Sequence, residues 1–566
     1  MNALSLENQA RCALMLSGKD RQDLLVLCRQ AAAVVRALPA EEVYQTIKEV
    51  GGNDALPLMA VMSTEQLQYA FDVEWWRGDK FLPDRALNWL EWAEKANDEH
   101  LTAWFQSEEF EAKVVLLQAL LKVGKEDETS APVEGVGDQA PWTPDGVYKL
   151  YFMVPEAEPI LKRVFMKMVA DDPKLFFVLM EGVIWELVTP AVERAYQWRL
   201  VRTGEKGIPD FQEAFGVYSM LAPNALKLPP PEASDFVPVP GDLVVPPRYP
   251  LAEADPATFF GQCLALLKSP ERFDAICWEL VYLANKVLVA DRRDMGDLEA
   301  RRETLRKVLG YINLGLESGA GGDIARGEKL LAQTWMQNLF QVGYGALMRL
   351  KWDAEKAIRD HSKLMDRILS PALFEHLMAL VGRFPKIGML STPEEGDAPE
   401  THWRDVASEA DLKRLSQLLE ETLFQVRFVK MGLGLAAEDL DRLYQKCRYP
   451  QRSDIDATAL VLTSLANHAL FGQVVCEPIS EAGALSFLQM IFLPTPFPDE
   501  PRVVTPNILE PFKARLLESP MAWTDPDRDR FENLIQAALA TLDEQFGRLD
   551  PRGPIEWKFT RGLCIQ

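Results

Sequence analysis

The chain has 566 residues, of which 48% are hydrophobic and 26% are charged, a composition typical of globular proteins with large cores. Its 84 acidic and 61 basic residues give a net charge of -23, which disfavours nucleic acids and anionic membranes as primary partners because their phosphates would be repelled. At roughly 100–200 residues per domain, this length predicts about three or four structural units.

Seven cysteines are scattered along the chain with no CxxC spacing, a distribution typical of reduced thiols in the cytosol. The first residues lack a basic segment followed by an apolar core, so no signal peptide is expected. The longest uncharged stretch, residues 457–476, contains threonine, serine, asparagine, histidine and glutamine and is too polar to span a bilayer. We therefore expect a cytoplasmic protein with no membrane span.

Helical periodicity begins near residue 24, where apolar side chains recur at steps of four and three residues: Leu24, Cys28, Ala31, Val35 and Leu38. This spacing predicts one amphipathic helix over residues 24–38, which Pro39 ends. Farther along, Ser63 and Gln66 have the spacing of a capping box and predict the start of another helix. Residues 20–123 are therefore interpreted as short helices joined by tight turns.

Residues 175–188 are apolar on nearly all sides, which predicts a central, buried helix. Asp172 is placed to open this helix, and Pro155 is placed to open the helix before it. The same order of proline and acid occurs at Pro39 and Asp54. One interpretation is that the second part of the chain is a degenerate repeat of the first, as in proteins built from stacked helical repeats.

Segments rich in proline, glycine or acidic residues divide the chain into four predicted helical blocks. The blocks cover residues 1–124, 146–222, 253–388 and 410–566, and the linkers cover residues 125–145, 223–252 and 389–409. The predicted fold class is all-α. We expect stacked short helix pairs in a superhelical or solenoid-like arrangement, with little or no β-sheet.

A short N-terminal segment resembles the cytoplasmic superhelical domain of MgtE-type magnesium transporters. The resemblance lies within residues 38–72 and is carried by residues 38–42 (LPAEE), 53–58 (NDALPL) and 62–67 (MSTEQL). It implies a superhelix of short helices. The transporters' membrane part and nucleotide-sensing domains have no counterpart in this sequence, so transport is not expected.

A longer resemblance, over roughly residues 20–350 by pattern, is to a family of large bacterial proteins of unknown function. It is carried by residues 199–218, which contain RLVR, Glu205, GIPDFQEA and Tyr218, and by residues 312–317 (INLGLE) and 339–344 (LFQVGY). The resemblance implies a bacterial origin and a mostly helical fold. It implies no activity.

Two glycine-rich segments approach nucleotide-binding motifs. Residues 322–329 (GDIARGEK) nearly fit a phosphate-binding loop, but Glu328 occupies the lysine position, Leu330 replaces the hydroxyl residue and no strand precedes them. Residues 432–437 (GLGLAA) fit a dinucleotide fingerprint, but residues 412–431 before them also have helical spacing. Both segments are therefore interpreted as helix boundaries.

No constellation of catalytic or metal-binding residues is apparent. The five histidines form no HExxH or HxH spacing, and no GxSxG elbow occurs. Carboxylates cluster at residues 108–111, 126–128 and 394–397, where they are typical of solvated helix ends and linkers. We therefore predict no catalytic, cofactor-binding or metal-ligating residue. The sequence favours a protein that is not an enzyme.

Five of the fourteen tryptophans lie between residues 75 and 104. Trp75 and Trp76 are adjacent and precede Arg77, at a predicted corner between two helices. A regular helix cannot point two adjacent rings into one core, so one indole is expected to be partly exposed, as at an interface. The alternative is that both rings cover the ends of neighbouring helices. Trp75, Trp76 and Arg77 are the predicted partner-binding residues.

The leading hypothesis is a non-enzymatic helical scaffold or adaptor that binds another protein. Its support is the solenoid-like pattern, the aromatic cluster and the lack of catalytic motifs. One alternative is an enzyme, or an enzyme subunit, whose site is assembled from distant residues. Another alternative is a sensor of a small ligand or a divalent cation.

Overall fold

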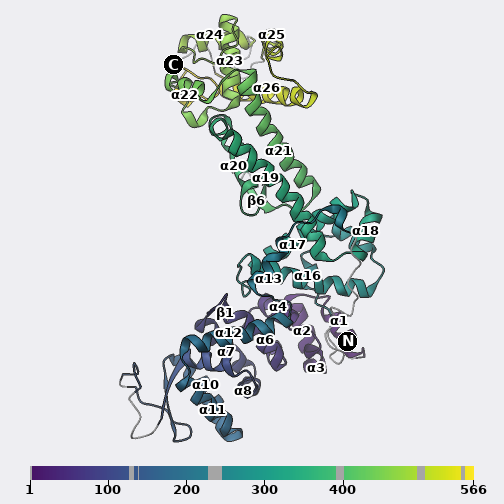
Figure 1. Ribbon diagram of the computed structural model, residues 1–566, viewed down its shortest axis with the longest axis vertical. Helices are drawn as coiled ribbons and strands as arrows, with labels where there is room; N and C mark the ends of the chain where they lie inside the picture. Colours follow the sequence, from purple (N-terminus) through teal and green to yellow (C-terminus); the bar gives the residue numbers. More distant parts are fainter. Residues whose placement is uncertain are drawn as a thin grey trace. The chain divides into compact units, whose positions relative to one another are not determined.

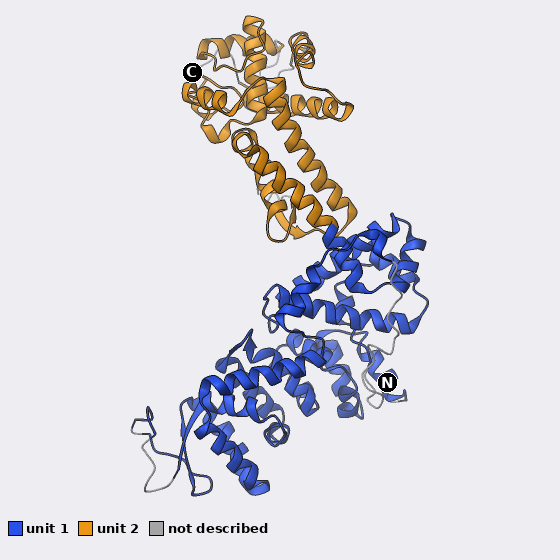
Figure 2. Cartoon of the chain, viewed as in Figure 1, with its two compact units in different colours: residues 1–345 blue, residues 346–566 orange. Residues whose placement is uncertain are grey.

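The computed structural model describes residues 3–125, 133–137, 139–226, 245–390, 401–493, 504–549 and 555–566. The structure is 68% helical and contains three two-stranded sheets among the described residues, which confirms the predicted all-α class. The chain divides into two compact units, residues 1–345 and residues 346–566 (Figures 1 and 2). The boundary between them falls within α19 (Met336–Ile368).

The N-terminal part of unit 1 consists of short helices and two hairpins (Figure 1). Its helices are α1 (Leu6–Ala13), α2 (Gly18–Val26), α3 (Ala31–Arg36), α4 (Ala40–Val50), α5 (Leu56–Met59), α6 (Thr64–Glu74), α7 (Pro83–Ala96), α8 (Asp98–Phe105), α9 (Phe110–Leu120), α10 (Glu158–Asp171), α11 (Pro173–Trp185) and α12 (Val188–Glu205). The antiparallel pairs are β1 (Trp76–Arg77) with β2 (Lys80–Phe81), and β3 (Leu121–Lys125) with β4 (Tyr148–Phe152). Helix α4 packs against α2 and α6, α10 against α11, and α9 against α12.

The rest of unit 1 contains both short and long helices. They are α13 (Phe211–Phe215), α14 (Tyr249–Ala252), α15 (Phe259–Leu266), α16 (Pro270–Ala290), α17 (Leu298–Ala320), α18 (Ile324–Gln333) and the start of α19. Of these, α16 and α17 have 21 and 23 residues. Helix α16 packs against α13 and α17, and α18 packs against α15 and α17.

Unit 2 contains the rest of α19, one hairpin and seven further α-helices in its described part. These elements are α20 (Pro371–Val381), β5 (Lys386–Leu390), β6 (Thr401–Asp405), α21 (Glu409–Arg427), α22 (Ala437–Lys446), α23 (Ala457–Phe471), α24 (Glu481–Ile491), α25 (Pro506–Leu517) and α26 (Asp525–Phe546). Helix α23 packs against α24 and α26, and Ile565 pairs by backbone with Tyr449 and Ile479. Among the described helices of the whole chain, none combines the length and the apolar character that a membrane crossing requires.

The four-block division and the degenerate repeat stay predictions, since the two compact units are a coarser division than the sequence suggested. Much of the predicted linkers lies outside the described residues, namely 126–132, 138, 227–244 and 391–400. The described ends of the third linker belong to the hairpin of β5 and β6. In the two segments compared as repeats, α5 has 4 residues, whereas α11 has 13.

Several predicted helix boundaries are confirmed by the structure. Ser63 and Gln66 form the capping box of α6, and Asp323 caps α18 directly after the glycines that resemble a phosphate-binding loop. Residues 425–431 are helical, so the strand that a dinucleotide fingerprint requires is not present there. The continuous helix predicted over residues 24–38 is wrong, because α2 ends at Val26 and α3 begins at Ala31, with Leu27 81% exposed in the break.

Helix α11 is also not the central, buried helix that its composition predicts. Phe176, Leu179 and Met180 are buried, but Phe177, Val178 and Trp185 lie on the opposite, solvent-exposed side. In Figure 1, α11 lies at the edge of unit 1 beside α10, so only one of its faces has neighbouring helices to pack against. An apolar helix surface therefore remains uncovered.

Helices α17 and α19 approach each other so closely at two glycines that their backbones are in contact. A Cβ atom added to Gly315 would lie 1.9 Å from the carbonyl oxygen of Leu339, and one added to Gly343 would lie 2.1 Å from that of Tyr311. Real Cβ atoms essentially never approach another heavy atom this closely, and a carbonyl in a helix cannot move aside alone. These positions therefore require glycine, which gives a physical reason for the INLGLE and LFQVGY segments.

We expect Gly315→Ala, and separately Gly343→Ala, to destabilise unit 1 by about 2 kcal/mol or more, as overpacking a core does. Urea unfolding followed by circular dichroism measures this change. The matched control is Gly204→Ala near the end of α12, where an added Cβ meets nothing within 4 Å. Alanine there is expected to be neutral or stabilising by up to about 1 kcal/mol. Equal stabilities for the crossing variants and the control would contradict the interpretation.

Candidate functional site

A cleft of about 750 Å³ opens in unit 1 between α12, β1, the segment after α12 and the segment after α16. Its lining includes four arginines: Arg77, Arg199, Arg292 and Arg293. Three aromatic rings also line it: Trp76, Tyr196 and Phe211. This volume is within the range of small-molecule sites, and we refer to it as the arginine cleft.

Helix α12 is held beside α6 by a salt bridge between residues far apart in the sequence. Arg202 donates from Nε and Nη2 to the two carboxylate oxygens of Asp72, over 2.8 and 2.7 Å, and from Nη1 to Glu109 over 2.5 Å. The Asp72 side chain is only 5% exposed and that of Arg202 is 21% exposed. A two-pronged bond of this kind fixes direction as well as distance. It determines which side chains of α12 face the cleft.

One turn earlier on α12, Arg199 lies buried in the wall of the cleft. Its Nε donates to the backbone oxygen of Asp72 over 2.6 Å, and the guanidinium lies 6.0 Å from the ring of Trp76 and 5.9 Å from that of Tyr196. Within the described part of the chain, no carboxylate lies within ion-pair distance of it. Burial lowers the pKa of Arg199, and the nearby charge of Asp72 opposes that shift.

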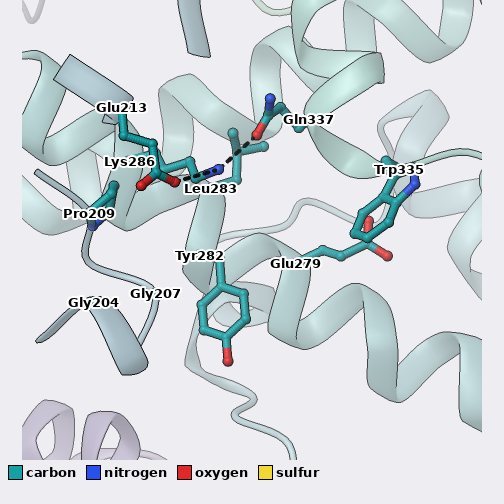
Figure 3. A pocket seen from close by; sticks show the side chains of 10 residues that line it. All are labelled: Gly204, Gly207, Pro209, Glu213, Glu279, Tyr282, Leu283, Lys286, Trp335 and Gln337. Carbon is teal, nitrogen blue, oxygen red and sulfur yellow. Dashed lines mark hydrogen bonds and ion pairs between the residues drawn. The ribbon is translucent and has the colours of Figure 1, made fainter. Parts of the chain in front are cut away.

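Residues 207–210 (GIPD) separate the arginine cleft from a second, smaller pocket of about 260 Å³ (Figure 3). Gly207 has a φ of +73°, and a Cβ there would lie 1.9 Å from the ring of Tyr282, so this contact requires glycine. Asp210 accepts hydrogen bonds from the first amides of α13. In the smaller pocket, Lys286 lies between Gln337 at 3.2 Å and Glu213 at 3.8 Å. The ammonium group of this pocket therefore already has partners within its own lining.

The far wall of the cleft is formed by the segment directly after α16, in which Arg292 has a φ of +55°. Few residues other than glycine adopt this left-handed conformation, and it directs the Arg292 guanidinium over the ring of Phe211 at 4.6 Å. The preceding residue, Asp291, accepts hydrogen bonds from Lys307 and Tyr218 over 2.8 and 2.7 Å. Burial raises the pKa of Tyr218, and so does the charge of Asp291. These bonds anchor the backbone next to Arg292.

Two residues after Arg292, Asp294 also lines the cleft, but its carboxylate is bound by an arginine that does not line it. Arg85 on α7 donates to both of its carboxylate oxygens, over 3.0 and 2.6 Å. Burial alone would raise the pKa of Asp294, but the hydrogen bonds from Arg85 and the Gly296 amide lower it below the usual value. Asp294 is therefore ionised and already compensated.

The structure brings two of the three predicted partner-binding residues to this cleft. Trp76 and Arg77 line it, whereas Trp75 points elsewhere and stacks on Phe71 at 4.2 Å. Both indoles are buried, at 1% and 4% exposure, so the expected partly exposed indole is not found, and Arg77 is the exposed member. Trp75 ends α6 and Trp76 begins β1, so the two rings are not constrained by one helix, and both are buried in the same core beside Phe81. Their role in partner binding stays a prediction.

Sequence reasoning missed the arginines of α12 and of the segment after α16 as parts of a site. Arg199 and Arg202 lie in the RLVR segment that carries the family resemblance, and Arg292 and Arg293 belong to a mixed-charge stretch. The signal in the sequence is the pair of arginines one turn apart, followed within seven residues by Gly204, Gly207 and Pro209. Among the described residues, no group of three or more His, Cys, Asp or Glu side chains could hold a metal ion.

A second surface, hereafter the α11 face, consists of Phe177, Val178 and Trp185, which are 38%, 54% and 71% exposed. The indole nitrogen of Trp185 donates to Glu181 over 2.8 Å, and the ammonium group of Lys125 on β3 lies 5.9 Å from its ring. Two further apolar residues, Leu187 and Val188, are exposed directly after the helix. The exposed tryptophan is therefore held in place rather than free to rotate.

Fold and site together describe a mostly helical protein with an arginine-lined cleft and an uncovered apolar helix. A family model described as "Family of unknown function (DUF6178)" matches residues 1–566, and the chain belongs to this family. This confirms the expected resemblance to a family of unknown function. No curated protein and no solved structure matches the chain, and the resemblance to magnesium transporters is not confirmed.

We expect Asp72→Asn to destabilise unit 1 by about 3 kcal/mol, because it removes the buried carboxylate that accepts both hydrogen bonds of the two-pronged salt bridge from Arg202. Chemical unfolding of the purified chain measures the change. The control is Asp98→Asn, which removes an exposed pair with Lys167 at 2.8 Å and should cost less than about 1 kcal/mol. Similar losses from both substitutions would show that the Asp72 bond does not hold α12 in place.

Proposed function

We propose that the protein is a non-enzymatic helical scaffold that binds another protein through the α11 face. The observation that supports this most is the exposure of three large apolar side chains on one side of a well-packed helix. Contiguous apolar surface is costly to leave in water, and in soluble proteins it marks interaction sites. The opposite side of the same helix is anchored in the core, so the surface is presented rigidly.

The chemistry of the α11 face suits a protein partner. Tryptophan is enriched among residues that dominate binding energy, and Trp185 is fixed by Glu181 and by Lys125, so little side-chain entropy is lost on binding. Lys125 and Glu181 also form an ion pair at 2.8 Å, which leaves the face close to neutral. A neutral apolar face favours an apolar protein segment over nucleic acid or an anionic lipid surface.

We propose a cytoplasmic location for the protein. The support is that all seven cysteines are free thiols and five of them are buried: Cys28, Cys263, Cys277, Cys476 and Cys564. Thiols used as small core residues suit a reducing compartment. The proposed partner is therefore sought among cytoplasmic proteins.

A photo-crosslinking experiment tests the partner proposal in the native cell. The benzophenone amino acid p-benzoylphenylalanine would replace Trp185 or Phe177, and Trp352 of unit 2, which is 49% exposed, in the control. We expect irradiation to give one discrete adduct with another protein from positions 185 and 177 but not from position 352. Mass spectrometry of the adduct would identify the partner. Arg77 would be replaced in the same way to test its predicted role.

Substitution separates binding from folding. Trp185→Ser and Val178→Ser should leave stability within about 0.5 kcal/mol of wild type, because both side chains are largely exposed. Either variant should reduce recovery of the cross-linked partner from position 177. The proposal fails if the adduct from position 177 is unaffected by these substitutions, or if position 352 gives the same adduct. A purely homodimeric adduct would also contradict a distinct partner.

A further inference from the structure

We propose that the arginine cleft is a binding site for a small molecule that carries one oxyanion, a carboxylate or a phosphate group, held by Arg199. Trp76 and Tyr196 form the apolar wall of this site, and Arg77 and Arg292 lie at its rim. The inference concerns a different surface from the α11 face and does not depend on the proposed protein partner.

The argument begins with the unused hydrogen-bonding capacity of Arg199. A guanidinium has five N–H donors. Among the described residues, Nε of Arg199 donates to the backbone oxygen of Asp72, and Nη1 makes a long 3.5 Å contact with the carbonyl oxygen of Gly78. Its Nη2 has no acceptor among the residues that the structure describes, although Arg199 is only 6% exposed. A buried cation without a paired acid is costly, and an anion that enters the cleft would compensate it.

The walls of the cleft strengthen that attraction. The guanidinium lies 6.0 Å from the ring centroid of Trp76 and 5.9 Å from that of Tyr196, and the two rings are themselves 5.9 Å apart, so both lie on one side of it. This aromatic wall limits the access of water, so the charge of Arg199 is weakly screened and acts strongly on a ligand within hydrogen-bonding distance. The planar fork of a guanidinium is the geometry that binds carboxylate and phosphate through two bonds.

The balance of charges in the lining indicates one anionic group rather than a polyanion. Arg77 and Arg292 have no carboxylate within ion-pair distance in the described residues, whereas Arg293 pairs with Glu303 at 3.2 Å. Of the acids, Asp294 is held by Arg85 and Asp210 by the amides of α13. Asp79, Glu193 and Asp210 are exposed, so water screens their charges, whereas Arg199 is buried. A lining with three unpaired arginines and three exposed acids favours a ligand of low charge and disfavours a nucleic acid.

Three probes test the site on the full chain: phenyl phosphate, benzoate and inorganic phosphate. Isothermal titration calorimetry measures affinity, and labelling of arginine by phenylglyoxal, read by mass spectrometry, locates the ligand. We expect phenyl phosphate or benzoate to bind saturably and to protect Arg77 and Arg292 from labelling. Arg326, an exposed arginine of α18, should remain unprotected. The aromatic probe that binds more tightly identifies the preferred oxyanion. The difference in affinity between phenyl phosphate and inorganic phosphate measures the contribution of contacts between the phenyl ring and the aromatic wall.

Variants assign the binding to Arg199 and its neighbours. Arg199→Lys keeps the positive charge but removes the planar guanidinium that can bind an oxyanion through two hydrogen bonds. We expect it to weaken binding by about tenfold or more. Arg77→Gln and Arg292→Gln change exposed residues and should each weaken it by about threefold or more without unfolding the chain. Arg326→Gln is the control and should bind as wild type does.

The outcomes are decisive even if the Arg199 variant fails to fold, because the two rim variants then carry the test. The proposal is overturned if no probe binds the wild-type chain at concentrations up to about 10 mM. It is also overturned if the rim variants bind as tightly as the Arg326 control. Neither result would affect the cross-linking from the α11 face, so failure of one proposal is distinguishable from failure of the other.

Discussion

The bond between Asp72 and Arg202 is the constraint on which the candidate site of unit 1 depends. It joins α6 to α12 across 130 residues of sequence and leaves Asp72 almost without exposure to solvent. Because the Asp72 carboxylate is used by Arg202, it is not available as a salt-bridge partner for Arg199, which receives only the backbone oxygen of the same residue. One acid thus positions two arginines, satisfies one of them and leaves the other with unused donors towards the cleft.

Unit 1 uses buried charge repeatedly to join helices, and this pattern makes the exceptions informative. Arg21 with Glu42, Arg272 with Glu279 and Lys307 with Asp291 are all paired at low exposure. Buried pairs of this kind contribute little net stability, but breaking one is costly, so they favour one arrangement of helices over its alternatives. Against that background, the unused donors of the buried Arg199 and the uncovered apolar face of α11 are two features of the described residues that such pairs do not account for.

The helical class and several caps were predictable from the sequence, because periodicity and capping are local effects that residues within one or two turns determine. Ser63 with Gln66 illustrates this. The burial of α11 was not predictable, because composition reports how apolar a helix is but not how many neighbours it has. The same limit applies to Trp75 and Trp76, where the helix ends and a two-residue strand begins, which allows both rings to be buried. The cleft arginines are brought together by contacts between residues far apart in the sequence, such as 127 residues between Arg199 and Asp72 and 73 between Tyr218 and Asp291, and a single sequence contains no record of such pairings.

The contact between α17 and α19 at Gly315 and Gly343 has a consequence for how the two units can be observed separately. Where two helix backbones touch, solvent has no route to the amides, and local fraying cannot expose them. Amide hydrogens in α17 around Tyr311 and in the first turns of α19 should then exchange with deuterium only when unit 1 opens as a whole. Their exchange rate would measure how often unit 1 opens as a whole, since both glycines of the contact lie in unit 1.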